Sequence, residues 1–130
     1  MKQEVYIELG VFGPSLMPEQ ITEILNIKPH TIAHKGDIIP HTQIKHKESE
    51  WTYRFLMKKP WIIANGIKKA VKLLESHPNI KDACSTYNWE IQIGIVMYLN
   101  SNCSTPIFSI KGDLLKRLAV FDASIDVDIY

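Results

Sequence analysis

The sequence has little of several things that particular protein classes require. Only two of its 130 residues are cysteine, Cys84 and Cys103, and they lack the close spacing of metal-binding pairs. Free thiols in a reducing compartment are the favoured interpretation, with one disulfide as the alternative. No apolar run is long enough to cross a membrane, and Glu4 and Glu8 interrupt the segment where a signal peptide needs apolar residues. We therefore expect a cytoplasmic protein.

Arginine is also scarce. Arg54 and Arg117 are the only two arginines among the fifteen lysine and arginine residues, and the net charge is +1. The charge is unevenly distributed, because residues 28–72 hold ten Lys/Arg against three acids, whereas 1–27 and 73–130 each carry a net charge of −3. Bidentate reading of phosphates and bases favours arginine over lysine. The basic middle of the chain is therefore weak support for nucleic-acid recognition.

Sequence motifs that bind phosphate or present a nucleophile are missing as well. The chain contains no phosphate-binding P-loop, no G-x-G-x-x-G and no G-x-S-x-G. No local signature marks either cysteine as a nucleophile. We therefore expect no catalytic residues, no cofactor and no enzymatic activity.

What the chain does have is clear hydrophobic periodicity. Apolar and polar residues alternate over 5–12, 51–57, 89–99 and 124–130, which predicts half-buried strands, with a short additional strand at 107–110. Apolar stripes with helical spacing predict a helix that starts at Pro18, one from Pro60 to about His77, and a short one capped by Asp113. The predicted fold is one α+β domain over residues 1–130, in the order β-α-β-α-β-β-α-β. Its sheet has four to five mainly antiparallel strands, with the helices packed on one face.

Residues 30–50 are the least regular part of the sequence. They contain Gly36-Asp37, Pro40 and four histidines, and they predict a long loop with short extended pieces near Ile38-Ile39. A zinc site needs three or four convergent ligands, and His30 and His34 have a suitable spacing only on a helix, which Pro29 argues against. We interpret His30, His34, His41 and His46 as exposed loop residues.

The strand pattern also predicts the composition of the uncovered face of the sheet, which we call the open face. With the apolar positions against the helices, this face receives Tyr6, Glu8, Thr52, Arg54, Glu90, Gln92, Tyr98, Asp126, Asp128 and Tyr130. Four acids against one base give it a net charge of −3. RNA-binding sheets also expose aromatic residues, but they need positive charge around the rings. An acidic face with tyrosines suits a basic protein partner better, and the plain alternative is the solvated side of a sheet.

Two carboxylates on one strand could also bind a metal. Asp126 and Asp128 lie on the same side of their strand, about 7 Å apart at the usual rise, and Glu90 is a candidate third ligand. A single D-x-D pair is a weak signal, so we expect no metal site.

Several of these segments resemble a bacterial family known as domain of unknown function 4279. The segments that carry the resemblance are residues 18–29 (PEQITEILNIKP), 35–37 (KGD), a strand opening at Trp51, and 125–130 (IDVDIY). One departure is Asn26, where the family favours glycine, and asparagine can adopt the same left-handed cap. The resemblance implies a small α+β cytoplasmic protein and brings no catalytic residues.

These observations favour a protein-binding module over an enzyme. By analogy of size, charge and missing catalytic motifs, we expect an immunity-type protein that neutralises a basic bacterial toxin with its acidic face. The expected contact residues are Glu8, Glu90, Tyr98, Asp126, Asp128 and Tyr130, in a monomer or a homodimer. One alternative is a small metal- or ligand-binding protein, or an enzyme, that uses Asp126/Asp128 or the histidine-rich loop. Another is a nucleic-acid or small-ligand binder that uses the basic stretch around Lys58, Lys59, Lys68, Lys69 and Lys72.

Overall fold

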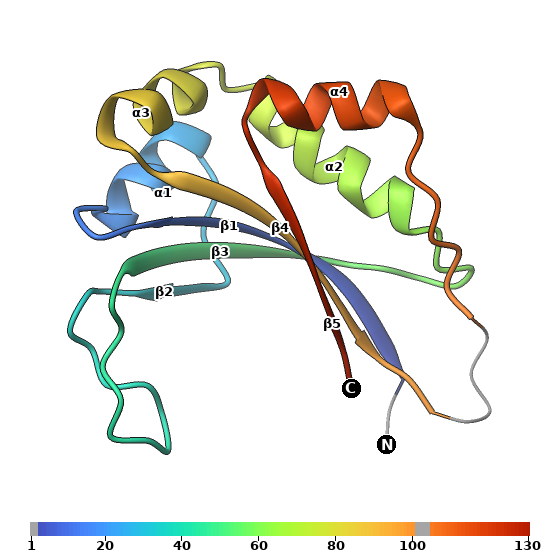
Figure 1. The fold of residues 1–130 in the computed structure, drawn as a ribbon, viewed down its shortest axis with the longest axis horizontal. Coiled ribbons are helices and arrows are strands. Elements are labelled where there is room, and N and C mark those ends of the chain that lie inside the picture. Colours follow the sequence, from blue (N-terminus) through green and yellow to red (C-terminus); the bar gives the residue numbers. More distant parts are fainter. Residues whose placement is uncertain (1–2, 101–104) are drawn as a thin grey trace.

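The computed structural model describes residues 3–100 and 105–130, which form a five-stranded sheet with four helices on one side of it (Figure 1). The strands are β1 (Glu4–Gly13), β2 (Thr31–Ala33), β3 (Ser49–Leu56), β4 (Glu90–Tyr98) and β5 (Ser124–Ile129). The helices are α1 (Pro18–Leu25), α2 (Ile63–Glu75), α3 (Asn79–Tyr87) and α4 (Gly112–Val120). The α+β class and the mostly antiparallel sheet predicted from the sequence are confirmed.

The strand order in the sheet is β2-β3-β1-β4-β5. β1 is the central strand and pairs antiparallel with both β3 and β4, and β2 pairs antiparallel with β3. β5 alone is parallel to its neighbour β4. A parallel pair needs a crossover connection, usually a helix, and α4 lies in the connection between these two strands (Figure 1).

The core lies between the sheet and the helices. Val5, Ile7, Leu9 and Val11 of β1 are fully buried, and they share one cluster with the apolar stripe of α2. Gly66 of α2 permits this close packing, because a Cβ atom at this position would lie 2.4 Å from Cγ1 of Ile7. The three tryptophans are buried or nearly so, with 0% exposure at Trp51 and 6% at Trp61 and Trp89.

The helix ends follow the expected chemistry only in part. Pro18 occupies the first turn of α1, and Asn26 ends it in the left-handed conformation with φ 52°, as predicted. Asp113 was expected to cap α4, but the N-cap position belongs to Lys111 and Asp113 lies in the first turn. A carboxylate there still interacts favourably with the helix dipole. Among the described helices none is long and apolar enough to span a membrane.

Three elements differ from the prediction. Helix α3 was not predicted; it begins directly after Pro78, and Asn88 caps its C-terminal end with φ 57°. Thr31–Ala33 was expected to be loop but forms the edge strand β2, because it pairs with β3. The strand expected at 107–110 is reduced to a single parallel bridge between Ile107 and Ile62.

The environment of β5 also differs from the prediction. Residues 124–130 were expected to form a half-buried strand, and β5 is exposed along its whole length. The helices pack over β1, β3 and β4, so β5 lies at the edge of the sheet beyond the part that they cover. Ile125, Val127 and Ile129 point to the helix side of the sheet but retain exposures of 36%, 40% and 66%.

Candidate functional site

The open face is assembled by strand register. Tyr6 and Glu8 of β1 pair with Val96 and Gly94 of β4, and these two residues pair in turn with Asp128 and Asp126 of β5. Side chains of paired residues share one face, so the acids of β5 and β1 lie on the side of the sheet opposite the helices. Arg54 of β3 faces Glu8 from the other side.

Three tyrosines form a ladder across this face. The rings of Tyr130 and Tyr98 are stacked with centroids 4.9 Å apart, and those of Tyr98 and Tyr6 are 6.5 Å apart. Cζ of Arg54 lies 4.5 Å from the ring centroid of Tyr6, which is a cation–π distance. Tyr130, at the outer end of the ladder, is 64% exposed, whereas Tyr6 is buried beneath its neighbours. The ladder therefore offers a partner an aromatic contact that is already ordered.

The buried end of the ladder has altered chemistry. Burial raises the pKa of the Tyr6 phenol to about 12, against the opposing effect of the Arg54 charge. Arg54 Nε donates a hydrogen bond of 3.0 Å to Oε2 of Glu8. The carboxylate of Glu8 thus neutralises the positive charge of the one cationic residue predicted on this face. Asp126 and Asp128 have no ion pair within the described chain.

Gly94 lies between two carboxylate-bearing residues in the register of the strands. It separates Asp126 from Glu8 in the register, and a Cβ atom at this position would lie 3.6 Å from Cβ of Glu8. Two strand spacings put the backbones of Asp126 and Glu8 about 10 Å apart. A lysine or arginine side chain of a partner placed over Gly94 would have a carboxylate on either side.

Sequence reasoning missed two acids of the open face. Glu4 pairs with Tyr98, and Glu50 pairs with Phe12, so both share the side of Tyr6 and Glu8. Burial raises the pKa of the Glu50 carboxyl above its usual value. The signal was present in the alternation, since Glu4 and Glu50 continue the polar positions of β1 and β3 beyond the ranges predicted for them.

Of the six expected contact residues, the structure brings five together and separates one. Tyr98, Tyr130, Asp128, Asp126 and Glu8 occupy one half of the face. Glu90 pairs with Phe12, four residues along β4 from Gly94, which is about 13 Å away. Glu90 is thus at the far end of the face and is no third ligand for the aspartates. In the described residues no group of three or more His, Cys, Asp or Glu is arranged to hold a metal.

The histidines of the 30–50 segment do not converge either. Nε2 of His34 lies 2.9 Å from Oε1 of Glu19, and its backbone N–H donates to Oδ2 of Asp37. The segment folds back on itself, with Ile38 bridging Lys45. Of the two cysteines, Cys84 is a free buried thiol whose pKa burial raises to about 11, and Cys103 lies outside the described residues.

β5 also presents a free backbone edge beside the open face. The N–H of Tyr130 donates to the carbonyl of Met97, and its carbonyl accepts from the N–H of Leu99. In a parallel pair alternate residues bond to the neighbouring strand, so Asp126 and Asp128 share the direction of Tyr130. The N–H and C=O groups of Ile125, Val127 and Ile129 therefore point away from β4, where another strand could pair with them.

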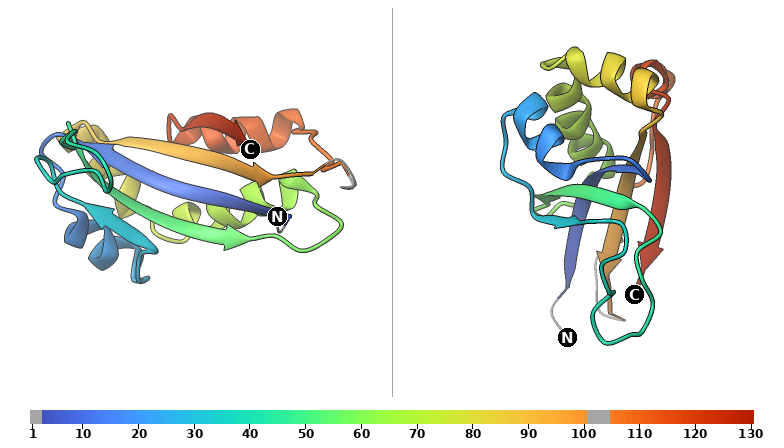
Figure 2. Two further views of the ribbon diagram at one scale, coloured as in Figure 1. Left: turned by 90° about the horizontal axis from the view of Figure 1, so that it is seen from below. Right: turned by 90° about the vertical axis from the view of Figure 1, so that its left-hand side faces the viewer.

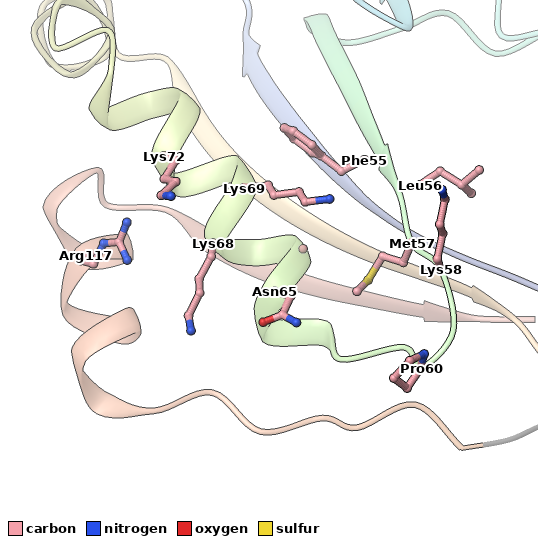
Figure 3. A pocket seen from close by; sticks show the side chains of 11 residues that line it. Phe55, Leu56, Met57, Lys58, Pro60, Asn65, Lys68, Lys69, Lys72 and Arg117 are labelled. Atoms are coloured by element: carbon pink, nitrogen blue, oxygen red, sulfur yellow. The ribbon is translucent and has the colours of Figure 1, made fainter.

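A second polar surface lies on the helix side, as a groove of about 570 Å³ along α2 (Figure 3). We call it the lysine groove. It is lined by Phe55, Leu56, Met57, Lys58, Pro60, Asn65, Gly66, Lys68, Lys69, Lys72 and Arg117. It contains most of the basic stretch that the sequence offered as an alternative binding site, and sequence reasoning missed the apolar wall opposite these lysines.

Comparison with protein families matches the chain, over residues 3–130, to a domain of unknown function (DUF4279). The chain belongs to this family. The match covers nearly the whole sequence and confirms the resemblance drawn from the residues. Neither the curated proteins nor the solved structures yield a match to the chain. As a DUF4279 protein it carries a family description that assigns no activity, so any function has to be argued from its surfaces.

Proposed function

We propose that this DUF4279 protein is a non-catalytic binding module that engages a basic protein partner through the open face. The observation that carries the proposal is the uncovered sheet face itself. Its strands hold six carboxylates, those of Glu4, Glu8, Glu50, Glu90, Asp126 and Asp128, against the single cation of Arg54, which is already paired with Glu8. Complementary charge of this kind speeds the encounter with a partner and selects against wrong ones.

The exposed half of the tyrosine ladder supplies the anchor for such a contact. Tyr98 and Tyr130 stack on each other, and tyrosine is enriched among residues that dominate binding energy at protein interfaces. A cationic side chain of the partner placed over Gly94 would lie beside them, between Asp126 and Glu8. Anchor and charge lie on the same two strands, β4 and β5.

The free edge of β5 extends this contact. A strand from the partner that pairs with Ile125, Val127 and Ile129 would place alternate side chains beside Asp126 and Asp128. Lysine or arginine at those positions complements the aspartates. A second copy of β5 would put aspartate opposite aspartate in an antiparallel pairing, which is unfavourable, so the edge fits a basic partner better than a copy of this chain.

The biological role that we propose is that of a cytoplasmic immunity-type protein whose partner is a basic toxin. This role rests on analogy with small acidic inhibitors and on the charge of the open face. The structural part of the proposal, a basic protein on the open face, stands without it.

The experiment compares three forms of the protein as bait for cytosol from the cells that express it. The face variant is Asp126→Lys with Asp128→Lys, and the control is Glu23→Lys with Asp82→Lys, which makes the same change of charge on the exposed surfaces of α1 and α3. We expect one stoichiometric basic partner on the wild type and the control, and its loss from the face variant. With the purified partner, association of the wild type should slow as salt is added. Equal capture by all three forms, or no partner at low salt, would overturn the proposal.

The alternative of a small metal- or ligand-binding protein, or an enzyme, built on Asp126/Asp128 or the histidine loop has its own test. Calorimetric titration with Mg²⁺, Mn²⁺ and Zn²⁺ should give no saturable heat if the open face serves a protein partner. Stoichiometric binding that Asp126→Asn removes would favour the metal alternative.

A further inference from the structure

The lysine groove combines a cationic side with an apolar one. Lys68, Lys69 and Lys72 project from the exposed side of α2, and Lys58 stands across from them, just beyond β3 (Figure 3). Phe55 and Met57, both half-buried, form the apolar wall at the end of β3. The ring of Phe55 is held edge-on against Tyr53, with centroids 4.9 Å apart.

The positive charge of the groove is not neutralised by the protein. Within the described chain, none of Lys58, Lys68, Lys69 and Lys72 pairs with a carboxylate. Among the residues that the structure describes, the only acid bonded to a lining residue is Glu75, whose two carboxylate oxygens accept hydrogen bonds of 3.0 and 2.6 Å from Arg117. Lys68 and Lys72 are four residues apart on one helix, a spacing at which like charges repel. An anion in the groove would relieve that repulsion.

The floor of the groove is fixed by the packing of α2 on the sheet. A Cβ atom on Gly66 would meet Cγ1 of Ile7 at 2.4 Å and Sδ of Met57 at 3.1 Å, so the helix sits close against β1 and the end of β3. The lysines are therefore carried on an element whose position is set by buried contacts. Their flexible stems adjust to the anion, and the apolar wall does not need to move.

We propose that the lysine groove binds a small organic diphosphate, with the phosphates among Lys58, Lys68, Lys69 and Lys72 and an apolar or aromatic part against Phe55 and Met57. Its volume of about 570 Å³ is within the usual range for small-molecule sites. Lysine binds phosphate as a point charge and needs no fixed bidentate geometry. Four cations suit a multiply charged anion better than a single carboxylate.

A nucleic-acid strand fits the groove less well. Binding of single strands relies on several aromatic side chains that stack successive bases, and Phe55 is the only aromatic residue in the lining. The one arginine of the lining is committed to Glu75. The geometry therefore favours a small molecule, and this site is independent of the open face on the other side of the sheet.

The test is calorimetric titration of the whole protein with pyrophosphate, adenosine diphosphate and adenosine. We expect saturable one-to-one binding of pyrophosphate, tighter binding of adenosine diphosphate, and no measurable binding of adenosine. The groove variant Lys68→Gln with Lys72→Gln should bind both anions about tenfold more weakly, or weaker still. The matched control, Lys28→Gln with Lys81→Gln, removes the same charge from exposed positions outside the groove and should bind like the wild type.

The apolar part of the proposal has a separate readout. Phe55→Leu should weaken the binding of adenosine diphosphate and leave the binding of pyrophosphate unchanged. Circular dichroism of each variant verifies that it is folded. No saturable heat with either anion would overturn the proposal, and so would equal losses in the groove and control variants. A third outcome is an oligonucleotide that binds more tightly than adenosine diphosphate does and loses this binding in the groove variant. That result would show that the ligand of the groove is a nucleic acid and not a small molecule.

Discussion

Gly66 sets how closely α2 approaches the sheet, so the stability of the fold should be sensitive to substitution at this residue. In Gly66→Ala the new methyl group would overlap the fully buried side chain of Ile7. Overpacking of a core costs about 1–3 kcal/mol, and alanine returns up to about 1 kcal/mol through its higher helix propensity. We expect a net loss of about 1–2 kcal/mol of unfolding free energy, measured by urea denaturation.

Gly112→Ala is the matched control for that prediction. Gly112 is the first residue of α4, as Gly66 is an early residue of α2. A Cβ atom at Gly112, however, has no neighbour within 4 Å. Its unfolding free energy should be unchanged or slightly raised. A Gly66→Ala protein as stable as Gly112→Ala would show that α2 and the sheet are less tightly packed in solution than the 2.4 Å approach to Ile7 implies.

Tyr6 should give the protein a distinct dependence on alkaline pH. Its pKa is raised from about 10 to about 12 by burial, so the folded state holds the phenolic proton more tightly than the unfolded state does. The resulting stabilisation is complete below pH 10 and is lost as the pH rises through 12, by about 2–3 kcal/mol. The measurement is the difference in unfolding free energy between wild type and Tyr6→Phe across this range. If the two curves stay parallel, the phenol is not buried in solution.

At the scale of single residues, the sequence predicted the positions that a local rule governs. Asn26 ends α1, because a left-handed cap is a local requirement that asparagine meets. The separation of Glu90 from Asp126 could not be predicted. Both residues follow the strand alternation, and their distance depends on the register between β4 and β5, which no residue of either strand specifies alone.

Among the elements, β5 offers the sharpest test of how a partner docks. In Val127→Pro the lost N–H is one that points away from β4, and edge strands accept proline at such positions. We expect Val127→Pro to stay folded and to bind the partner about tenfold more weakly, because one backbone hydrogen bond to the partner strand is lost. The measurements are circular dichroism and the dissociation constant with the purified partner.

Asp128→Pro is its counterpart on the same strand. Its N–H points toward β4, so this change should lower the unfolding free energy by about 1–3 kcal/mol. If Val127→Pro binds the partner normally while the Asp126→Lys, Asp128→Lys variant does not, the open face is the contact and the edge of β5 is not part of it.

The elements that sequence reasoning found and missed differ in how much of their structure is local. Strong alternation in β1, β3 and β4 and the stripe of α2 reflect burial in the core, so pattern alone sufficed. The signal for α3 was present but weak, with Ile80, Ala83, Cys84 and Tyr87 at helical spacing, and only Ile80 and Cys84 buried. β2 carries no pattern of its own. It is a strand because β3 offers it an edge.

For the molecule as a whole, the small net charge conceals two opposed surfaces. The open face is acidic, and the lysine groove along α2 is basic. Figure 2 shows that α2 lies on one side of the sheet, and the open face is the other side. We expect the protein to be retained at low salt and neutral pH on both anion- and cation-exchange resins, despite a net charge of +1.

The two charge variants should separate these retentions. Asp126→Lys with Asp128→Lys should weaken binding to the anion exchanger, and Lys68→Gln with Lys72→Gln should weaken binding to the cation exchanger. Weakening of both retentions by one variant would mean that the two surfaces are not independent.

The central position of β1 has a consequence for how the protein is made. β1 precedes all its partners in the chain, yet its two neighbours in the sheet are β3 and β4, about 45 and 85 residues later at their pairing positions. A ribosome therefore releases the strand with the most buried residues well before the segments that cover its edges. Until residues 90–98 emerge, β1 has a free edge and an apolar side, a state that is prone to aggregation and attracts chaperones. We expect the nascent chain to depend on such assistance more than the finished protein does.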